Sequence, residues 1–370
     1  DLIVDAYHKS SRDFLMQLPL PNIYGGGSGQ GAIGSPYVNL GKMDNRGIDV
    51  SLNTVNIDRG KFKWKTGLTY SVYRNEIVEL ATDNSAVTAN SYFYGVFDIF
   101  TRSVIDRPIG QFYGFVTDGI FETEEQILAA PVQVLQDGSV STENPQGLNY
   151  VHNRDGVWLG DIKYKDINND GVINTDDQTF IGNPNPKFSF GLNNSFTYGN
   201  FDLTVYITGV YGFDIFNASR IRTEGMLNQS NNQLATIANR AQIEMIDPTG
   251  SLDDINNVRL INPGTDIPRF TSTNVNGNAR IMQDRWIEDG SFVRIQNVSL
   301  GYMLPSSLIS KVNLNRVRVY FNAQNLHVFT NYSGLDPEVG ASNQNILTAG
   351  IDTGRYPTPR VFTLGLNVDF

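Results

Sequence analysis

Long segments of alternating apolar and polar residues constrain the fold of this chain more than any other feature. Between residues 360 and 370, Phe362, Leu364 and Leu366 take every second position, with polar or small residues between them. Successive side chains of a β-strand point to opposite faces, so this pattern predicts a strand with one apolar and one polar face. The same pattern predicts about ten strands, at residues 1–16, 45–56, 61–76, 95–105, 109–118, 186–198, 201–213, 290–304, 316–329 and 360–370.

The length of these strands separates the possible β architectures. Each predicted segment has about ten residues or more, the length of a membrane-spanning strand and roughly twice that of a typical sandwich strand. Hydrophobic residues make up 40% of the chain and the mean hydropathy is -0.26, yet no apolar run approaches the ~20 residues of a membrane helix. A helical membrane protein is therefore excluded. A membrane β-barrel, which exposes only every second residue to lipid, is compatible.

The links between the predicted strands alternate between short and long. Short links lie at 58–60, 106–108 and 199–200, the 304–315 link is intermediate, and long links cover 17–44, 77–94, 119–185, 214–289 and 330–359. Outer-membrane barrels have short turns at the periplasmic rim and long loops outside. We therefore predict that residues 1–370 are part of one antiparallel transmembrane β-barrel domain, with large extracellular loops at 119–185 and 214–289 and Phe370 in the periplasm. Within these loops, a short surface helix is predicted at 122–130 and a longer helix at 226–247.

Charge and composition argue against several other function classes. The net charge is -10 and no basic stripe alternates with aromatic residues, which argues against a nucleic-acid partner. The chain has no cysteine, and His8, His152 and His327 are isolated from one another in sequence. Because no nucleophile motif or convergent acid–base pair is recognisable, we expect no enzymatic activity and no catalytic or metal-binding histidine.

The segment 166–177 matches the first half of an EF-hand-type calcium loop. Its alternate positions carry side-chain oxygen atoms, and Gly171 permits the sharp turn that would fold them around one hard cation. The predicted ligands are Asp166, Asn168, Asp170, Val172 through its carbonyl oxygen, and Asp177. The alternative is a metal-free turn rich in Asn and Asp. We predict a structural Ca²⁺ ion that orders an extracellular loop.

Aromatic residues in the loops form a second group of candidates. Tyr92, Phe93, Tyr94, Trp158 and Tyr332 could stack on the sugar rings of a solute. The alternative for each is an interfacial or packing role, which is the more frequent role of aromatic residues in barrels.

Ordered motifs along the chain add a family resemblance. They are NRGID at 45–49, IGQFYGF at 109–115, GIF at 119–121, IGNPNP at 181–186, DGSFVRIQNVSLGY at 289–302, VYFNAQNL at 319–326 and TNYSGLDPE at 330–338. Together with the calcium-like loop, these motifs resemble the SusC/RagA-type TonB-dependent transporters, in the C-terminal portion of their barrel. The resemblance covers essentially the whole chain.

This resemblance implies a barrel of about 22 strands, of which this chain supplies the C-terminal ones. It implies energised import of oligosaccharides or peptides across the outer membrane of a Bacteroidetes-type Gram-negative cell, with TonB and a SusD-like surface lipoprotein as partners. It also implies that Phe370 is the barrel-assembly signal. The N-terminal plug and the segment that contacts TonB have no counterpart in these residues, so we expect the chain to be one part of a larger transporter.

Two alternatives stay open on the sequence alone. The first is a small passive outer-membrane channel closed by the ten predicted strands, whose lumen would be too narrow for a large solute. The second is a secreted, calcium-stabilised β-sandwich that binds glycans. Solubility without detergent would favour the sandwich over both membrane hypotheses.

Overall fold

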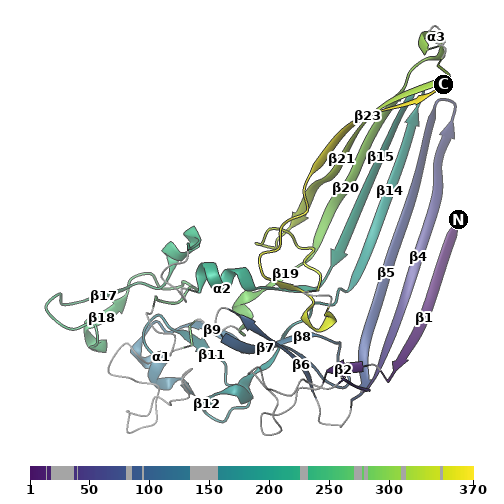
Figure 1. The fold of residues 1–370 in the computed structure, drawn as a ribbon. Helices are drawn as coiled ribbons and strands as arrows, with labels where there is room; N and C mark the ends of the chain where they lie inside the picture. Colours follow the sequence, from purple (N-terminus) through teal and green to yellow (C-terminus); the bar gives the residue numbers. More distant parts are fainter. Residues whose placement is uncertain are drawn as a thin grey trace, which may run out of the picture.

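The structure is a computed structural model. Its largest sheet is antiparallel and has eight long strands (Figure 1). The structure describes residues 1–13, 15–17, 37–39, 41–80, 86–93, 96–133, 157–225, 232–270, 277–278, 282–309, 314–341 and 345–370. The strands of this main sheet are, in spatial order, β1 (Leu2–Arg12), β4 (Lys42–Arg59), β5 (Phe62–Glu79), β14 (Phe188–Tyr198), β15 (Phe201–Tyr211), β20 (Phe292–Met303), β21 (Arg316–Thr330) and β23 (Val361–Asp369). Spatial order follows chain order, so the sheet is a single up-and-down meander.

The register of the main sheet keeps an apolar face separate from a polar face. Directly paired residues lie on the same face, and one apolar row consists of Val4, Val50, Tyr70 and Phe190. The neighbouring polar row consists of Asp5, Asp49, Ser71 and Ser189. The apolar face is exposed to its surroundings, since the side chains of Leu364 and Phe362 are 77% and 59% exposed. The two-faced strands predicted by the alternation are therefore confirmed.

All short links of the main sheet lie at one end and all long links at the other (Figure 1). The tight turns between β4 and β5 and between β14 and β15 contain Gly60 and Gly199, whose φ angles of 56° and 58° favour glycine. The link at 304–315 lies at the same end and includes α3 (Ser306–Ile309). The described residues of the long links 80–187, 212–291 and 331–360 pack together at the opposite end, and we call them the loop assembly.

The prediction that ten strands share one sheet was wrong for two of them. The segments at 95–105 and 109–118 contain β7 (Val96–Ser103) and β8 (Gln111–Gly114), which join β6 (Val87–Phe93) and β13 (Thr179–Gly182) in a separate sheet. Three of the four β8 residues are buried, so this strand lacks the exposed face that a lipid-facing strand needs. The short link at 106–108 hydrogen-bonds to Ile77 near the end of β5, at the long-link end.

The remaining strands of the described chain are short and pair locally. They are β2 (Leu15–Gln17) with β3 (Tyr37–Asn39), β9 (Thr117–Ile120) with β11 (Ile162–Tyr164), β10 (Val132–Gln133) with β12 (Val172–Ile173), β17 (Ile243–Met245) with β18 (Val258–Leu260), and β16 (Asp214–Asn217) with β19 (Ile287–Asp289) and β22 (Ile351–Asp352). The helical elements of the loop assembly are α1 (Glu124–Ala129), α2 (Ala218–Glu224) and the 3-10 turns η2 (Thr175–Asp177), η3 (Ala235–Asn239), η4 (Ile255–Asn257), η5 (Asp284–Trp286) and η8 (Ile346–Thr348). Among the described residues, every helix is too short or too polar to cross a membrane.

The two predicted helices have different outcomes. Helix α1 confirms the prediction at 122–130, and it begins where the Thr123 side chain accepts a hydrogen bond from the backbone N–H of Gln126. The helix predicted at 226–247 is wrong in its described part, which forms η3 and β17 instead. Ile243 and Met245 alternate with Glu244 and pair with β18, so strand pairing replaces the helical pattern.

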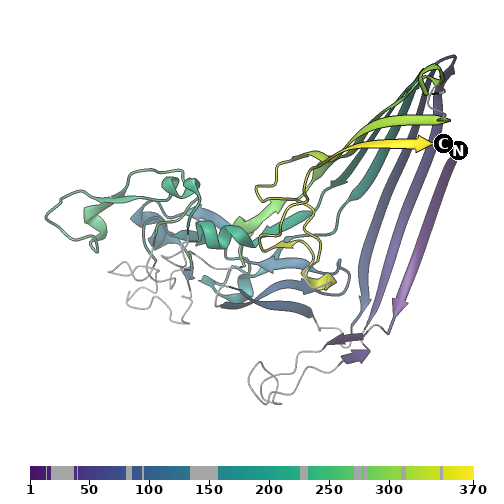
Figure 2. The same cartoon turned by 45° about the horizontal axis from the view of Figure 1, so that its top comes forward.

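The hydrophobic core lies in the loop assembly rather than along the main sheet. Its largest cluster includes Phe100, Phe112, Phe216, Met282 and Trp286, which come from four separate segments. A second cluster contains Phe121, Ile127 and Trp158. Figure 2 shows the loop assembly at one end of the curved main sheet, which places a packed domain over one rim of the strands.

Candidate functional site

The polar face of the main sheet is the first part of the candidate site. Across β1, β4, β5, β14 and β15 it forms a shallow concavity of about 680 Å³. The polar residues that line it include Asp5, Asp49, Ser71, Ser189 and Thr208. The Ser71 hydroxyl donates to the Asp49 carboxylate at 2.5 Å. Carboxylate and hydroxyl groups in such a surface can exchange hydrogen bonds with a hydrated solute.

A glycine on this face makes room for a tyrosine. A Cβ atom on Gly191 would lie 3.1 Å from the Tyr206 hydroxyl oxygen and 2.8 Å from the Thr69 Oγ1 atom. Gly191 and Tyr206 lie on the neighbouring strands β14 and β15. Gly191 thus allows the Tyr206 ring to lie across the concavity, where it lines the surface together with the hydroxyl groups.

An ion pair crosses the polar face nearer to the short links. Arg318 on β21 donates from Nε to the Asp202 carboxylate on β15 at 3.0 Å, and a second hydrogen bond comes from Nη2. The guanidinium also lies 5.1 Å from the centre of the Tyr320 ring. This side of the sheet therefore carries paired charges and aromatic faces as well as hydroxyl groups.

A second arginine holds part of the loop assembly against the polar face. Arg294 on β20 is 1% exposed and contacts the carboxylates of Asp336 and Glu338 at 2.6 and 2.8 Å. Burial would raise the pKa of Asp336, but backbone N–H groups of Glu338 and Thr358 donate to its carboxylate and keep the pKa below its ordinary value. The link between β21 and β23 is therefore fastened onto the polar face by charge.

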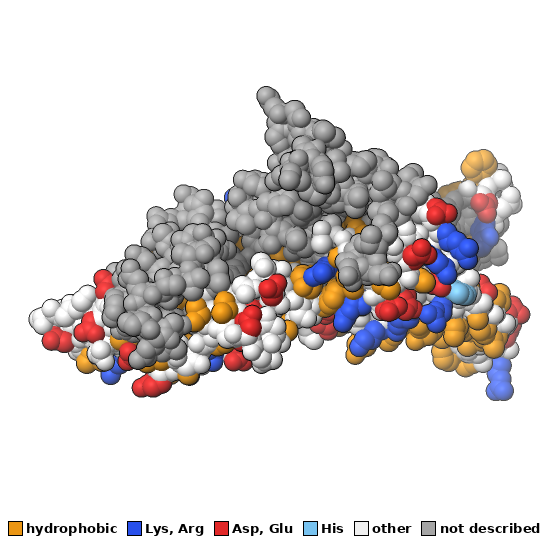
Figure 3. All heavy atoms as spheres, turned by 90° about the horizontal axis from the view of Figure 1, so that it is seen from below, with side chains coloured by type: hydrophobic (Ala, Val, Ile, Leu, Met, Phe, Trp, Pro, Cys, Tyr) orange, Lys and Arg blue, Asp and Glu red, His pale blue; other side chains and the backbone are white. Residues whose placement is uncertain are grey.

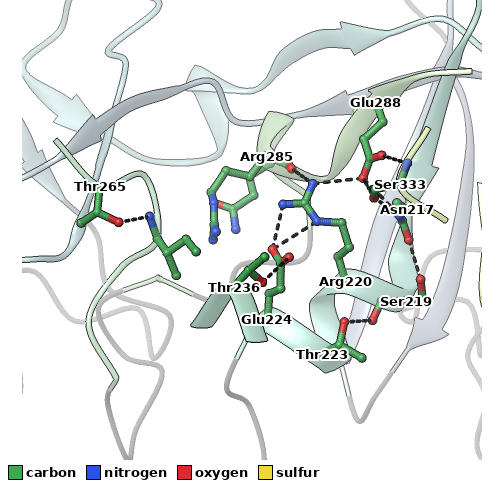
Figure 4. A network of polar contacts seen from close by, with 12 residues as sticks. Asn217, Ser219, Arg220, Thr223, Glu224, Thr236, Thr265, Arg285, Glu288 and Ser333 are labelled. Carbon is green, nitrogen blue, oxygen red and sulfur yellow. Dashed lines mark hydrogen bonds and ion pairs between the residues drawn. The ribbon is translucent and has the colours of Figure 1, made fainter. Parts of the chain in front are cut away.

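A network of ion pairs and hydrogen bonds lies deeper in the loop assembly (Figure 4). Arg220 of α2 binds Glu224 through Nε and Nη2 and binds Glu288 of β19 through Nη1. Glu288 also accepts hydrogen bonds from Asn217 and from Ser333. Burial lowers the pKa of Arg220, but the two carboxylates outweigh it and raise the pKa. The network joins the β15–β20 link to the β21–β23 link.

A further buried ion pair fastens another part of the same assembly. Asp161 is fully buried and contacts Arg269, with Nε at 2.6 Å from the carboxylate. The Asn278 side chain donates to the same carboxylate, and the backbone N–H of Trp158 donates to its other oxygen. The segment that contains Trp158 and Asp161 is thereby attached to Arg269 and Asn278.

Two of the predicted aromatic candidates are buried. Trp158 is 0% exposed and packs in the cluster around Phe121 and Ile127. Tyr332 is 6% exposed, and its hydroxyl donates to the Asp352 carboxylate at 2.6 Å. Burial and this hydrogen bond raise the pKa of Tyr332 far above its ordinary value. Both rings contact the protein's own core, so the prediction that they stack on a solute is corrected to a packing role.

The side chains of the other predicted aromatic candidates are not described by the structure. Tyr92 and Phe93 belong to β6, where the structure describes the backbone only, and Tyr94 lies outside the described residues. The contact of these three rings with a solute stays a prediction. Among the histidines, His8 lies 3.0 Å from the Asp44 carboxylate and His327 packs edge-on against Phe329, while His152 lies outside the described residues.

The segment predicted to bind calcium forms a compact turn. Asp166 accepts from the backbone N–H groups of Asn169 and Gly171, and Asp170 accepts from the backbone N–H of Val172. The Asp177 side chain is completely buried and accepts from two backbone N–H groups. Within the described residues, no three His, Asp or Glu side chains are placed closely enough to hold a metal ion.

One observation nevertheless fits a cation at this turn. The buried Asp177 carboxylate forms no ion pair with any described residue. A buried carboxylate that only backbone N–H groups neutralise carries a desolvation cost that a nearby cation would reduce. Asp166 and Asp170 add further carboxylate oxygens to the same turn. The donor set is therefore of the hard oxygen type that Ca²⁺ prefers.

Charged side chains of both signs lie at the loop end of the sheet. Figure 3 shows basic and acidic groups intermixed beside hydrophobic ones at this rim. The ion pairs there include Arg46 with Glu76 at 2.7 Å. This mixture agrees with a boundary between an apolar band and a polar environment.

No family model matches the chain, but several individual proteins resemble it in sequence. TonB-dependent receptor P3 of Formosa agariphila is 29% identical over 376 residues, which cover 100% of this chain and 32% of that protein. TonB-dependent receptor SusC of Bacteroides thetaiotaomicron is 22% identical over 99% of this chain and 30% of its own length. The chain thus spans about a third of the length of the curated relatives it matches.

Solved structures show the same fold. The RagAB peptide transporter superimposes with a TM-score of 0.68 over 100% of this chain and 33% of that chain, at 21% identity. The RagAB peptide importer in its open-open state gives a TM-score of 0.60. At this identity the likeness concerns the fold alone.

The chain is thus similar in sequence to proteins named TonB-dependent receptors and shares the fold of the RagAB transporter. The resemblance to the SusC/RagA type expected from the motifs is confirmed, since the matches extend over essentially the whole chain. The relatives are named as receptors and transporters, in agreement with the expectation that the chain has no enzymatic role.

Proposed function

We propose that this chain forms part of the wall and the loop assembly of an outer-membrane importer for large solutes. The whole transporter would use TonB as its energy source and a SusD-like surface lipoprotein as its partner. Its wall would be a closed barrel of about 22 strands, of which the eight strands of the main sheet are one sector.

The exposed apolar face of the main sheet is the observation that carries this proposal. Leu364, Leu366 and Phe362 are 77%, 60% and 59% exposed. Contact of apolar surface with water costs about 25 cal/mol per Å², so a continuous face of this kind needs an apolar environment. Lipid supplies it on one side of the sheet, while the polar face on the other side can contact a hydrated solute.

The distribution of the links supports an orientation. We propose that the tight turns at Gly60 and Gly199 are periplasmic and that the loop assembly is extracellular. Phe370 would then lie on the periplasmic side, where it is 92% exposed and free to act as the barrel-assembly signal. A loop assembly outside the cell would also offer the surface on which a lipoprotein lid closes.

The solute class is proposed as oligosaccharides or peptides. The hydroxyl groups and carboxylates around Ser71 and Asp49 suit either class, because both carry many hydrogen-bonding groups. Peptides are included because a structure that shares this fold is described as a peptide transporter.

We also propose that the turn at 166–177 binds Ca²⁺ and orders its part of the loop assembly. The ligands would be Asp166, Asn168, Asp170, the carbonyl oxygen of Val172, and Asp177. The buried charge of Asp177 supports this proposal, because an adjacent cation would stabilise it.

Both alternative functions conflict with an observation. A soluble sandwich would bury its apolar face between two sheets, whereas Leu364 and its neighbours on this face are exposed. A small channel closed by this chain alone would need β1 to pair with β23, and the described residues of these strands pair only with β4 and β21. The importer agrees with both observations.

Gene deletion tests the function directly. A strain that lacks the gene should lose growth on a mixture of peptides or of oligosaccharides as sole carbon source, and the full-length gene should restore it. Undiminished growth of the deletion strain on every solute that the wild type uses would refute the importer.

Cysteine labelling of intact cells tests the orientation, because the chain has no native cysteine. Ser251→Cys lies on the exposed surface of the loop assembly and Ser306→Cys lies in α3 at the opposite rim. A membrane-impermeant maleimide should label the first variant on intact cells and the second only after lysis. The reverse result would invert the proposed orientation.

A further inference from the structure

Two arginines beside one buried tryptophan have opposite environments. Trp286 of η5 is 0% exposed. The guanidinium carbon atoms of Arg220 and Arg285 lie 5.6 and 4.8 Å from the centre of its ring. The ring face therefore stabilises both cations, but only Arg220 forms ion pairs with carboxylates of the described residues.

Arg220 uses its donors within the protein. Its Nε and Nη2 atoms donate to Glu224, and its Nη1 atom donates to Glu288 and to the backbone oxygen of Arg285. Two carboxylates thus balance one guanidinium, and Figure 4 shows these contacts converging on Arg220. Neither carboxylate forms an ion pair with Arg285.

Arg285 is the opposite case. Its Nη1 atom is buried and has no hydrogen-bond partner, and in Figure 4 the contact drawn at this residue ends on its backbone oxygen. Burial lowers the pKa of Arg285, and the nearby charge of Arg220 lowers it further. An arginine still remains protonated at neutral pH. A largely buried guanidinium without a hydrogen-bonded counter-charge is costly unless a ligand supplies one.

We propose that Arg285 is a subsite for a carboxylate group of the transported solute. This inference rests on the proposed function as an importer. A guanidinium presents parallel N–H groups that match the two oxygens of a carboxylate. The Arg285 guanidinium also lies against the Trp286 ring, which helps to hold it in place. The nearby acidic groups Glu224 and Asp266 would repel a dianion such as phosphate more strongly than a monoanion, which favours a carboxylate.

Matched pairs of small probes test the subsite on the full-length transporter in detergent. Tri-alanine differs from tri-alanine amide, and glucuronate from glucose, mainly by one carboxylate. Isothermal titration should show at least one of the two acids bound about tenfold more tightly than its neutral counterpart. The pair that shows the preference identifies the source of the carboxylate, a peptide terminus or a uronic acid.

Substitutions assign the preference to this residue. Arg285→Gln should reduce the acid-to-neutral ratio to about one, and Arg285→Lys, which keeps the charge without the planar fork, should retain part of it. Arg259→Gln is the matched control, because Arg259 of β18 lies in the same long link, is exposed and already pairs with Glu244. It should leave the ratio unchanged.

Three results would overturn the subsite. In the first, the wild-type protein binds neither acid measurably. In the second, it binds each acid no more tightly than the neutral counterpart. In the third, Arg285→Gln keeps the acid-to-neutral ratio of the wild type. A lowered thermal unfolding midpoint of Arg285→Gln with an unchanged ratio would show a packing role instead. Uptake by cells tests the proposed function separately from the subsite. If cells need the gene for uptake but the wild-type acid-to-neutral ratio is one, the subsite is refuted and the importer is not.

Discussion

Arg318 reaches over Gly301 to the carboxylate of Asp202, and a Cβ atom on Gly301 would collide with the Nη2 atom of Arg318. The three residues lie on adjacent strands, with Gly301 of β20 between β15 and β21. The absence of a side chain at the central position is what allows an ion pair to bridge two strands that are not neighbours. The contact therefore connects three strands of the main sheet.

This ion pair should make a measurable but modest contribution to stability. The side chains of Arg318 and Asp202 are 22% and 35% exposed, so water screens part of the attraction. A double-mutant cycle with Asp202→Asn and Arg318→Met should give a coupling free energy of roughly 0.5–1 kcal/mol in urea unfolding in detergent, decreasing at high salt. The more exposed pair Asp58–Lys63 is the control and should couple more weakly. Equal coupling for the two pairs would contradict the bridging role.

Trp158 should behave as a core residue. Because its ring is fully buried, Trp158→Ala should reduce the free energy of unfolding by about 3–5 kcal/mol. Trp158→Phe should cost much less, because the indole Nε1 atom is buried without a hydrogen-bond partner and loses none on substitution. Phe270→Ala, at a ring that is 42% exposed, is the control. Thermal unfolding would measure all three, and a stable Trp158→Ala protein with altered solute affinity would restore the stacking role.

The hydroxyl of Tyr332 should stabilise the junction of the two links that it joins. Tyr332→Phe leaves the buried Asp352 carboxylate with one hydrogen bond fewer, which should cost about 1–3 kcal/mol locally. Hydrogen exchange should accelerate in the segments around 346–356 and 331–339. Tyr356→Phe alters a ring that is 90% exposed and should change neither segment. Unchanged exchange in Tyr332→Phe would show that the hydroxyl contributes nothing to the junction.

Calcium should order the turn at 166–177 if the proposed site exists. Chelation by EGTA should increase proteolysis of this turn, and Ca²⁺ at concentrations up to about a millimolar should reverse it. Asp170→Ala should reproduce the effect of chelation and lose the response to Ca²⁺. Asp176→Ala, an exposed carboxylate outside the proposed ligand set, should keep the response. Identical proteolysis of the wild type with and without Ca²⁺ would rule out the site.

Asp214 should make the loop assembly less stable as pH rises through the window between the ordinary and the raised pKa of its carboxyl group. Burial raises its pKa from the ordinary value of 3.8, and the nearby Asp289 raises it further. Between the ordinary and the raised pKa the folded state binds more protons than the unfolded state, so stability falls with increasing pH across this window. Asp214→Asn should remove this slope in thermal unfolding at a series of pH values, and Asp289→Asn should reduce it. A slope that is the same in Asp214→Asn would assign it to another group.

The main sheet could be predicted from sequence because alternation is a local property. Each strand carries its own apolar and polar faces, and pairing such as Val4 with Val50 follows from matching them. The assignment failed for β7 and β8 because alternation does not reveal what covers a strand. Phe112 is buried by Phe216, about a hundred residues away, and the segment itself contains no sign of that contact.

The polar centre of the loop assembly was mostly beyond sequence reasoning. Arg220 and Glu224 have the four-residue spacing of a helical ion pair, which was a detectable signal. Glu288 comes from a strand far along the chain, and no spacing rule brings it to Arg220. The burial of Tyr332 similarly depends on Asp352, which becomes its partner only in the folded chain.

The separation of long and short links to opposite rims has a consequence for how such a protein can diversify. Each long link leaves and returns at the same rim, so it can gain or lose residues without shifting any strand along its neighbour. An insertion within a strand would instead shift its register and move its side chains to the opposite faces. The loop assembly can therefore change in sequence and length while the main sheet keeps its register.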